Sequence, residues 1–238
     1  MKELVTIVIP VLEKPYHDSE LSTFKYYQKY LGDFPITFLK GESAGIPDGL
    51  SAVFPQADSM SFDSRYLLNQ QTFTRLLLNP DLYEQFSWTR FLLIADPHTT
   101  IVKNELAYWC RQGYDLVQPI PAASAELPVA DLLLKRLNPL AFVQKYHPKA
   151  GDIGQTGGFS LRKVDTFAKY TKNKKRRTHT FFDNFPEAES DQLFWEYFIN
   201  QFSPQLIVPN AISRRRFVQS AAAANQAPAT EKPFAISN

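Results

Sequence analysis

The stretch Phe91–Ile101, which reads FLLIADPHTTI, joins a run of apolar residues to a polar turn. A short apolar run that ends in turn residues is typical of a buried strand in a parallel sheet. Polar residues directly after such a strand lie at its carboxyl end, where open α/β sheets bind their ligands. Asp96 and His98 are two positions apart, so in an extended chain their side chains share a face and could converge on one ligand or ion. The alternative is that Asp96 merely begins a turn and that His98 is a solvated loop residue.

Composition limits the classes of protein to consider. The 238 residues are 44% hydrophobic and 14% aromatic, which is enough for the core of one large domain. A formal net charge of +2 gives no sign of a general nucleic-acid binder. One cysteine, Cys110, excludes an intrachain disulfide and a multi-cysteine zinc site, and its apolar neighbours favour a buried, unreactive thiol. Without a signal peptide or a run of ~18 apolar residues, the chain is expected to be soluble and cytoplasmic.

Strands and helices alternate along the chain, which predicts an α/β domain with a mixed, mostly parallel central sheet flanked by helices. Further strands are predicted at Leu4–Ile9, Ile36–Leu39, Asp115–Gln118 and Leu206–Val208. Helices are predicted from Asp18 or Ser19 to Leu31, from Ser61–Ser64 to Leu78, and at Asn104–Gln112, Lys163–Tyr170 and Ser190–Gln201. The segment Lys40–Ala57 is rich in Gly, Pro and Ser, which is typical of a loop.

The end of the chain differs in composition from the rest. We expect one domain over residues 1–212 and a flexible tail over residues 213–238, because Ala221–Ala224, Pro228 and Pro233 indicate a loosely attached segment. The basic run Lys172–Arg177 is typical of a solvated loop. It could also attract an anionic acceptor or a phospholipid surface, so peripheral membrane contact stays open.

Four segments occur together in a characteristic order. They are Ile9-Pro10 after the first strand, FTRLLLN at Phe73–Asn79, the strand that ends at Asp96–His98, and TGGFSLR at Thr156–Arg162. With these segments the chain resembles a family of glycosyltransferase domains of the GT-A type, and it is more distantly similar to the β-1,4-galactosyltransferases. The resemblance covers roughly residues 4–202. It implies a nucleotide-sugar-binding domain that transfers a sugar to a glycan or cell-surface polysaccharide acceptor, with inversion favoured.

The resemblance also implies where the donor binds. The loop after the first strand would contact the nucleotide through Pro10, Val11 and Glu13. The F-x-R motif would place Phe73 and Arg75 beside the donor. The same loop, Pro10–His17, offers Lys14 and His17 as further polar contacts.

The acidic motif after the central strand holds, in the resembled family, a divalent ion that bridges the donor phosphates. Here the ligands would be Asp96 and His98, with His98 standing where the family usually has an aspartate. A carboxylate suits Mn²⁺ or Mg²⁺, and an imidazole is tolerated more readily by Mn²⁺. The alternative is a metal-free site in which Arg75 and Lys40 hold the phosphates.

The later segments would serve the sugar and the acceptor. The glycine pair Gly157 and Gly158 would line this part of the site, because glycine lets the backbone approach a ligand closely. Aromatic rings at Phe159 and Trp195 could stack on sugars, although core packing is the more frequent role. The base would be a carboxylate of the acidic cluster, Asp191 as first choice and Glu189 as second. Asp191 could instead, or in addition, cap the following helix.

Three of these motifs depart from the family pattern, the first being Phe73-Thr74-Arg75 in place of the usual F-N-R. His98 replaces the usual aspartate, and Ser190-Asp191 replaces the usual Glu-Asp pair. The changes at His98 and at Ser190-Asp191 support a second hypothesis, a non-catalytic relative that keeps the fold and binds a nucleotide, a glycan or a partner protein.

Overall fold

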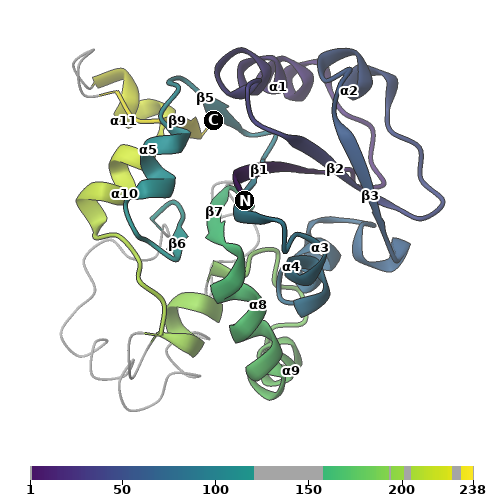
Figure 1. The fold of residues 1–238 in the computed structure, drawn as a ribbon, viewed down its shortest axis with the longest axis vertical. Helices are drawn as coiled ribbons and strands as arrows, with labels where there is room; N and C mark the ends of the chain where they lie inside the picture. Colours follow the sequence, from purple (N-terminus) through teal and green to yellow (C-terminus); the bar gives the residue numbers. More distant parts are fainter. Residues whose placement is uncertain (1, 121–157, 193, 201–204, 227–231, 238) are drawn as a thin grey trace.

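The centre of the computed structural model is a six-stranded sheet in the order β3-β2-β1-β4-β7-β6 (Figure 1). The structure describes residues 2–120, 158–192, 194–200, 205–226 and 232–237. The strands of the sheet are β1 (Glu3–Pro10), β2 (Ile36–Gly41), β3 (Asp58–Phe62), β4 (Thr89–Ile94), β6 (Leu116–Val117) and β7 (Ser160–Lys163). This arrangement confirms the predicted mixed α/β fold with a central sheet flanked by helices.

The strands with the longest apolar runs in the sequence pair in parallel at the centre of the sheet. β2, β1 and β4 are buried nearly throughout, as parallel core strands are, and β1 pairs in parallel with both neighbours. β7 is antiparallel to β4 and to β6. β2 and β3 extend from one side of β1, whereas β4 lies on the other side. The order therefore reverses between β1 and β4, and such a switch point is where open α/β sheets bind ligands.

Helices cover both faces of the sheet (Figure 1). On one face, α1 (Asp18–Leu31), α2 (Asp48–Val53) and α5 (Leu106–Arg111) pack against alternate residues of β1 such as Ile7. On the other, α3 (Gln70–Leu77), α4 (Pro80–Gln85), α8 (Val164–Asn173) and α9 (Lys175–Asn184) contribute to a core cluster that contains the intervening residues such as Val8. The alternation reflects the two-residue period of a strand.

The structure differs from the sequence prediction between residues 40 and 78. The predicted loop contains α2, and the polar stretch Asp58–Phe62 forms the edge strand β3, where one side of the strand faces solvent. The helix predicted to end near Leu78 is split into the short helix η1 (Ser64–Tyr66) and α3. Leu206–Val208 is not a strand, although the carbonyl of Ile207 accepts a hydrogen bond from the N–H of Asp115 at 2.8 Å.

The basic run Lys172–Arg177 is helical and not a loop. It spans the end of α8 and the start of α9, and Lys172 reaches Glu84 of α4 at 3.5 Å. The predicted aromatic helix after Asp191 is observed as a π-helical segment, Phe194–Ile199. No helix in the described part of the chain is long and apolar enough to cross a bilayer.

The end of the chain, which we expected to be a flexible tail, packs against the domain. It forms α10 (Ala211–Phe217), β8 (Val218–Ser220), α11 (Ala221–Gln226) and β9 (Ala235–Ser237), and β9 lies between β8 and β5 (Thr99–Ile101) in a small second sheet. Phe217 and Phe234 are fully buried and stack on each other at 5.4 Å, and Phe217 stacks on Phe159 at 5.3 Å. Two isolated phenylalanines in an alanine- and proline-rich segment therefore attach it to the core.

The single cysteine behaves as a core residue. Cys110 of α5 is 4% exposed, and burial raises the pKa of its thiol to about 12. Because the thiolate is the reactive form, we expect the native protein to react with a disulfide reagent such as Ellman's far more slowly than the same chain in guanidinium chloride. Release of the coloured thiol at pH 8 measures both rates, and equal rates would contradict the observed burial.

Candidate functional site

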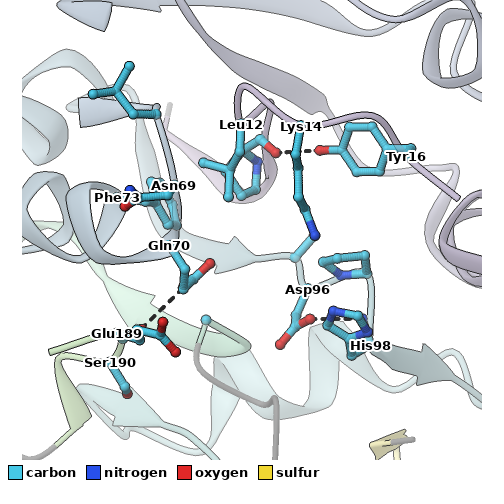
Figure 2. A pocket seen from close by; sticks show the side chains of 15 residues that line it. Leu12, Lys14, Tyr16, Asn69, Gln70, Phe73, Asp96, His98, Glu189 and Ser190 are labelled. Carbon is cyan, nitrogen blue, oxygen red and sulfur yellow. Dashed lines mark hydrogen bonds between the residues drawn. The ribbon is translucent and has the colours of Figure 1, made fainter. Parts of the chain in front are cut away.

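A cavity of about 280 Å³ opens at the carboxyl ends of β1 and β4, where the strand order reverses (Figure 2). Seven candidate site residues from the sequence line it: Pro10, Lys14, Phe73, Asp96, His98, Gly158 and Glu189. They come from the ends of β1 and β4 and the loops that follow them, from α3, and from the segments of Gly158 and Glu189 further along the chain. The fold thus brings together residues that the sequence only places in order.

Asp96 is the buried acid of the cavity. It follows β4 directly, is 5% exposed, and accepts a hydrogen bond from the N–H of His98 on Oδ1 at 2.8 Å. Burial raises the pKa of Asp96 to about 7, although the N–H groups of His98 and Gly158 and the nearby Lys14 ammonium favour its charged form. This carboxyl group is poised to ionise fully when a cation or a hydrogen-bond donor enters the cavity.

Lys14 supplies a positive charge beside Asp96. Its ammonium group donates to Oε1 of Glu20 at 3.0 Å, and Oε2 of Glu20 accepts the N–H of His17 at 2.9 Å. Burial alone would raise the pKa of Glu20, but these two donors lower it, so this residue of α1 stays ionised. The Lys14 side chain is 46% exposed and points into the cavity (Figure 2). Glu20 therefore holds Lys14 where a ligand can meet it.

His98 lies at the edge of the same cluster. Its Nε2 atom is 3.7 Å from Oε1 of Glu20. Burial and the Lys14 ammonium lower the pKa of His98, with Glu20 opposing them, so the imidazole is neutral at neutral pH. A neutral imidazole can ligate a metal or accept a hydrogen bond.

Glu189 lies on the α3 side of the cavity, opposite the β4 side that carries Asp96 (Figure 2). The loop that carries it is tied to α3, because Gln71 donates to the carbonyl of Pro186 at 2.6 Å and Gln70 to the carbonyl of Glu189 at 3.4 Å. The Glu189 side chain is exposed to the cavity. It is therefore a carboxylate on an anchored backbone that solvent and ligands can reach.

Asp191, the first choice for the base, does not line this cavity. Its two carboxylate oxygens accept hydrogen bonds from the guanidinium of Arg162 at 2.6 and 2.9 Å, and Oδ2 also accepts Nε1–H of Trp195 at 2.6 Å. Asp191 and Arg162 are each 1% exposed. Because three donors already bond to this carboxylate inside the core, a substrate hydroxyl cannot reach it. The base of a transfer reaction must therefore be another residue.

Both predicted sugar-stacking rings belong to the core. Trp195 is fully buried and packs against Phe167 at 4.6 Å, and Phe159 is 1% exposed within the stack of phenylalanines that anchors the chain end. Core packing, the more frequent role, thus describes both rings. Gly158 lines the cavity, whereas Gly157 lies outside the described residues.

The predicted phosphate contacts lie elsewhere. Lys40 donates to the carbonyl of Ala44 at 3.0 Å and does not line the cavity. Arg75 faces away from the cavity, because it is two positions from Phe73 on a helix and i and i+2 lie on opposite sides. Val11 is 4% exposed in the core, and Glu13 is exposed outside the cavity.

A divalent cation would find few protein ligands here. The described residues contain no group of three His, Cys, Asp or Glu side chains placed to hold a metal. Asp96 and His98 nevertheless line the same cavity. Asp96 supplies one carboxylate of the kind that holds Mg²⁺ or Mn²⁺ when other oxygen ligands complete the shell, whereas the imidazole of His98 suits Mn²⁺ better than Mg²⁺.

Sequence reasoning did not assign Glu20, Asn69, Gln70 or Ser190 to the site. Gln70 and Phe73 are three positions apart and share one face of α3, so the helical period would have placed Gln70 in the cavity once Phe73 was assigned. Glu20 gave no such signal, because its role depends on the folded path of the loop Pro10–His17.

Comparison with known proteins supports the fold and identifies the family. One solved structure, a glycosyltransferase involved in glycosylation of the major capsid of PBCV-1, matches with a TM-score of 0.50 at 11% sequence identity. The match covers 98% of this chain and 91% of that one, so the two share a fold. No curated protein matches at the level of sequence. Residues 56–236 match the family "Protein of unknown function (DUF5672)", and the chain belongs to this family.

Proposed function

We propose that the protein is a glycosyltransferase of the GT-A type that takes a nucleotide-sugar donor and passes its sugar to a glycan acceptor. The observation that carries the proposal is one cavity at the switch point of the sheet that holds Lys14, Asp96 and Glu189 together. The shared fold with a glycosyltransferase is consistent with it.

The donor would lie with its diphosphate between Lys14 and Asp96. Transfer breaks the bond between the anomeric carbon and the phosphate oxygen, so the leaving diphosphate gains charge that the site must neutralise. Lys14 provides one ammonium group for this purpose, held in place by Glu20. The apolar side of the cavity, which includes Leu12 and Phe73, would accommodate the less polar parts of the donor.

Glu189 would act as the base. The acceptor hydroxyl attacks the anomeric carbon from the face opposite the leaving group, and this direction of attack inverts the configuration. The hydroxyl gives its proton to the Glu189 carboxylate. Glu189 reaches the cavity from the side opposite Asp96, so the two carboxylates are free to serve different reacting groups (Figure 2). Walls that hold the donor and the acceptor in one orientation would also align the two reactants.

Asp96 and His98 would hold Mn²⁺ or Mg²⁺ together with the donor phosphates. The ion would supply positive charge to the leaving diphosphate. Three carboxyl groups, those of Glu20, Asp96 and Glu189, lie in or beside a cavity with one lysine. This excess of acidic groups favours a donor that arrives with a divalent cation over the metal-free alternative.

Donor binding tests the proposal directly. We expect calorimetry with UDP-, GDP- and CDP-sugars, with and without Mn²⁺, to detect binding of at least one donor. Lys14→Met should weaken that binding about tenfold or more, because a charge-assisted hydrogen bond to phosphate is lost. Lys40→Met is the matched control and should leave binding unchanged, since Lys40 does not line the cavity. Equal losses in both variants, or no binding across the panel, would overturn the proposal.

The non-catalytic alternative predicts a different pattern. A protein that only binds nucleotide or glycan would bind a donor in a Lys14-dependent way but release no nucleoside diphosphate with any acceptor. Measuring nucleoside diphosphate release in the same samples therefore separates the two functions.

A further inference from the structure

A second hollow of about 580 Å³ lies on the other side of α3 from the cavity, between η1, α3 and α9. We call it the basic groove. Its cations are Arg65 of η1, Arg75 of α3, and Lys175 and, when protonated, His179 of α9. One carboxylate, Asp183, also lines it. The groove thus collects positive charge from η1 and α3, which are neighbours in the sequence, and from α9, which lies about 100 residues further along the chain.

The α9 side of the basic groove is one face of the helix. Lys175, Thr178, His179 and Phe182 are spaced at i, i+3, i+4 and i+7, which brings them onto a single stripe. Arg176 is exposed on the same helix but does not line the groove. The run of basic residues in the sequence therefore does not act as one patch, because only part of it faces the groove.

Aromatic rings hold the two arginines of the groove in place. The guanidinium of Arg75 lies over the ring of Phe182 at 4.4 Å and donates to the carbonyl of Pro186 at 3.3 Å. The guanidinium of Arg65 lies over the ring of Tyr66 at 4.9 Å. A stacked guanidinium keeps its planar fork of donors in one orientation, so less conformational freedom is lost when it binds an anion.

Two of the groove's cations have no acidic partner among the described residues. Arg65 pairs with Asp63 at 3.1 Å, but no carboxylate of the described chain lies within ion-pair distance of Arg75 or Lys175. Arginine and lysine with unused donors, gathered in a concave site, match the oxygen atoms of a phosphate group.

We propose that the basic groove binds the phosphate group of a soluble phosphorylated carbohydrate; the cations of the groove select the phosphate, and the choice of a carbohydrate rests on the proposed function. The groove is recessed, and the rings that line it are covered by guanidinium groups, which favours a discrete ligand over the flat surface of a membrane. The loop from Pro186 to Glu189 joins the two sites, because Arg75 holds its start and Glu189 at its end lines the cavity. The two hollows share no lining residue and lie on opposite sides of α3, so a ligand in the basic groove is separate from the donor in the cavity.

Glucose 6-phosphate is the probe, with glucose and inorganic phosphate as comparisons, titrated by calorimetry at low salt. We expect glucose 6-phosphate to bind and Arg75→Gln/Lys175→Gln to weaken it about tenfold or more through loss of charge-assisted hydrogen bonds. Arg176→Gln is the matched control and should bind as the native protein does. Lys175→Gln alone, on an exposed position, serves if the double variant does not fold.

Three outcomes would overturn the proposal. The first is that Arg176→Gln weakens binding of glucose 6-phosphate as much as the double variant does. The second is that saturating UDP displaces glucose 6-phosphate, which would place its binding in the first cavity. The third is that glucose 6-phosphate does not bind. Vesicles of phosphatidylcholine with phosphatidylglycerol test the other source of phosphate. Vesicle binding that depends on Arg75 and Lys175 without binding of glucose 6-phosphate would assign the groove to a membrane instead. Donor binding at Lys14 is measured in a separate experiment. A failure of the proposed function therefore does not change how the titration with glucose 6-phosphate is interpreted.

Discussion

Replacing Asp191 by asparagine is expected to lower the free energy of unfolding by about 3–5 kcal/mol, because it leaves the buried Arg162 guanidinium without a counter-charge. The side chains of Asp191 and Arg162 are 2% and 1% exposed. Burial alone would lower the pKa of Arg162, but Asp191 and the hydroxyl of Tyr83 raise it above its usual range, so Arg162 stays charged. Chemical denaturation measures the loss.

The other contacts of Arg162 explain why the loss should be large. Its Nε donates to the hydroxyl of Ser160 at 2.8 Å, and Nη1 donates to the hydroxyl of Tyr83 at 3.1 Å. Tyr83 in turn donates to the carbonyl of Leu77 at 2.8 Å. The ion pair thus links the antiparallel strand β7 to α3, α4 and the π-helical segment. A single uncompensated charge would disturb all of them.

Replacing both partners distinguishes the loss of the ion pair from the cost of leaving one charge buried without a partner. Arg162→Met/Asp191→Leu should be more stable than Asp191→Asn alone, since no charge then remains in the core. Asp165→Asn is the control on an exposed aspartate whose side chain is 71% exposed, and it should change stability by less than about 0.5 kcal/mol. If Asp191→Asn were as stable as this control, the buried ion pair would not have the structural role described.

The sequence could predict the centre of the fold because burial leaves a strong pattern there. Phe91–Ala95 is a continuous apolar run and Leu4–Ile9 is interrupted only by Thr6, and short runs of this kind are typical of strands covered on both faces. The cavity follows from these two strands, since their carboxyl ends meet at the switch point. Asp96 could therefore be assigned to the site without knowledge of any other contact.

The remaining site residues depended on contacts that no local pattern records. Asp191 and Arg162 are 29 positions apart, and nothing near either residue indicates that they pair. The edge strand Asp58–Phe62 is too polar for an apolar signal, and Phe217 and Phe234 are single buried rings in a segment of low complexity. Arg75 is a different case. Its position two residues from Phe73 on a predicted helix already placed it on the opposite side.

Glu189→Gln is expected to reduce turnover by about 10²–10⁴-fold if Glu189 is the base of the proposed transfer, because an amide cannot accept the acceptor's proton. Donor binding and unfolding free energy should stay near the native values, since Glu189 is exposed and its backbone carbonyl, not its side chain, bonds to Gln70. Release of nucleoside diphosphate from the bound donor measures turnover. Asp191→Asn should show the reverse pattern, with its main effect on stability.

Glu187→Gln is the matched control, because Glu187 is exposed on the same loop and does not line the cavity. A general change in the charge of the loop would affect both variants alike, whereas a base at the cavity wall affects Glu189→Gln alone. Turnover that stays within a few-fold of native in Glu189→Gln would remove Glu189 from the reaction. The geometry would then leave Asp96 as the carboxylate inside the cavity, on the side where the leaving diphosphate is proposed to lie, and a direct displacement with Glu189 as base would no longer stand.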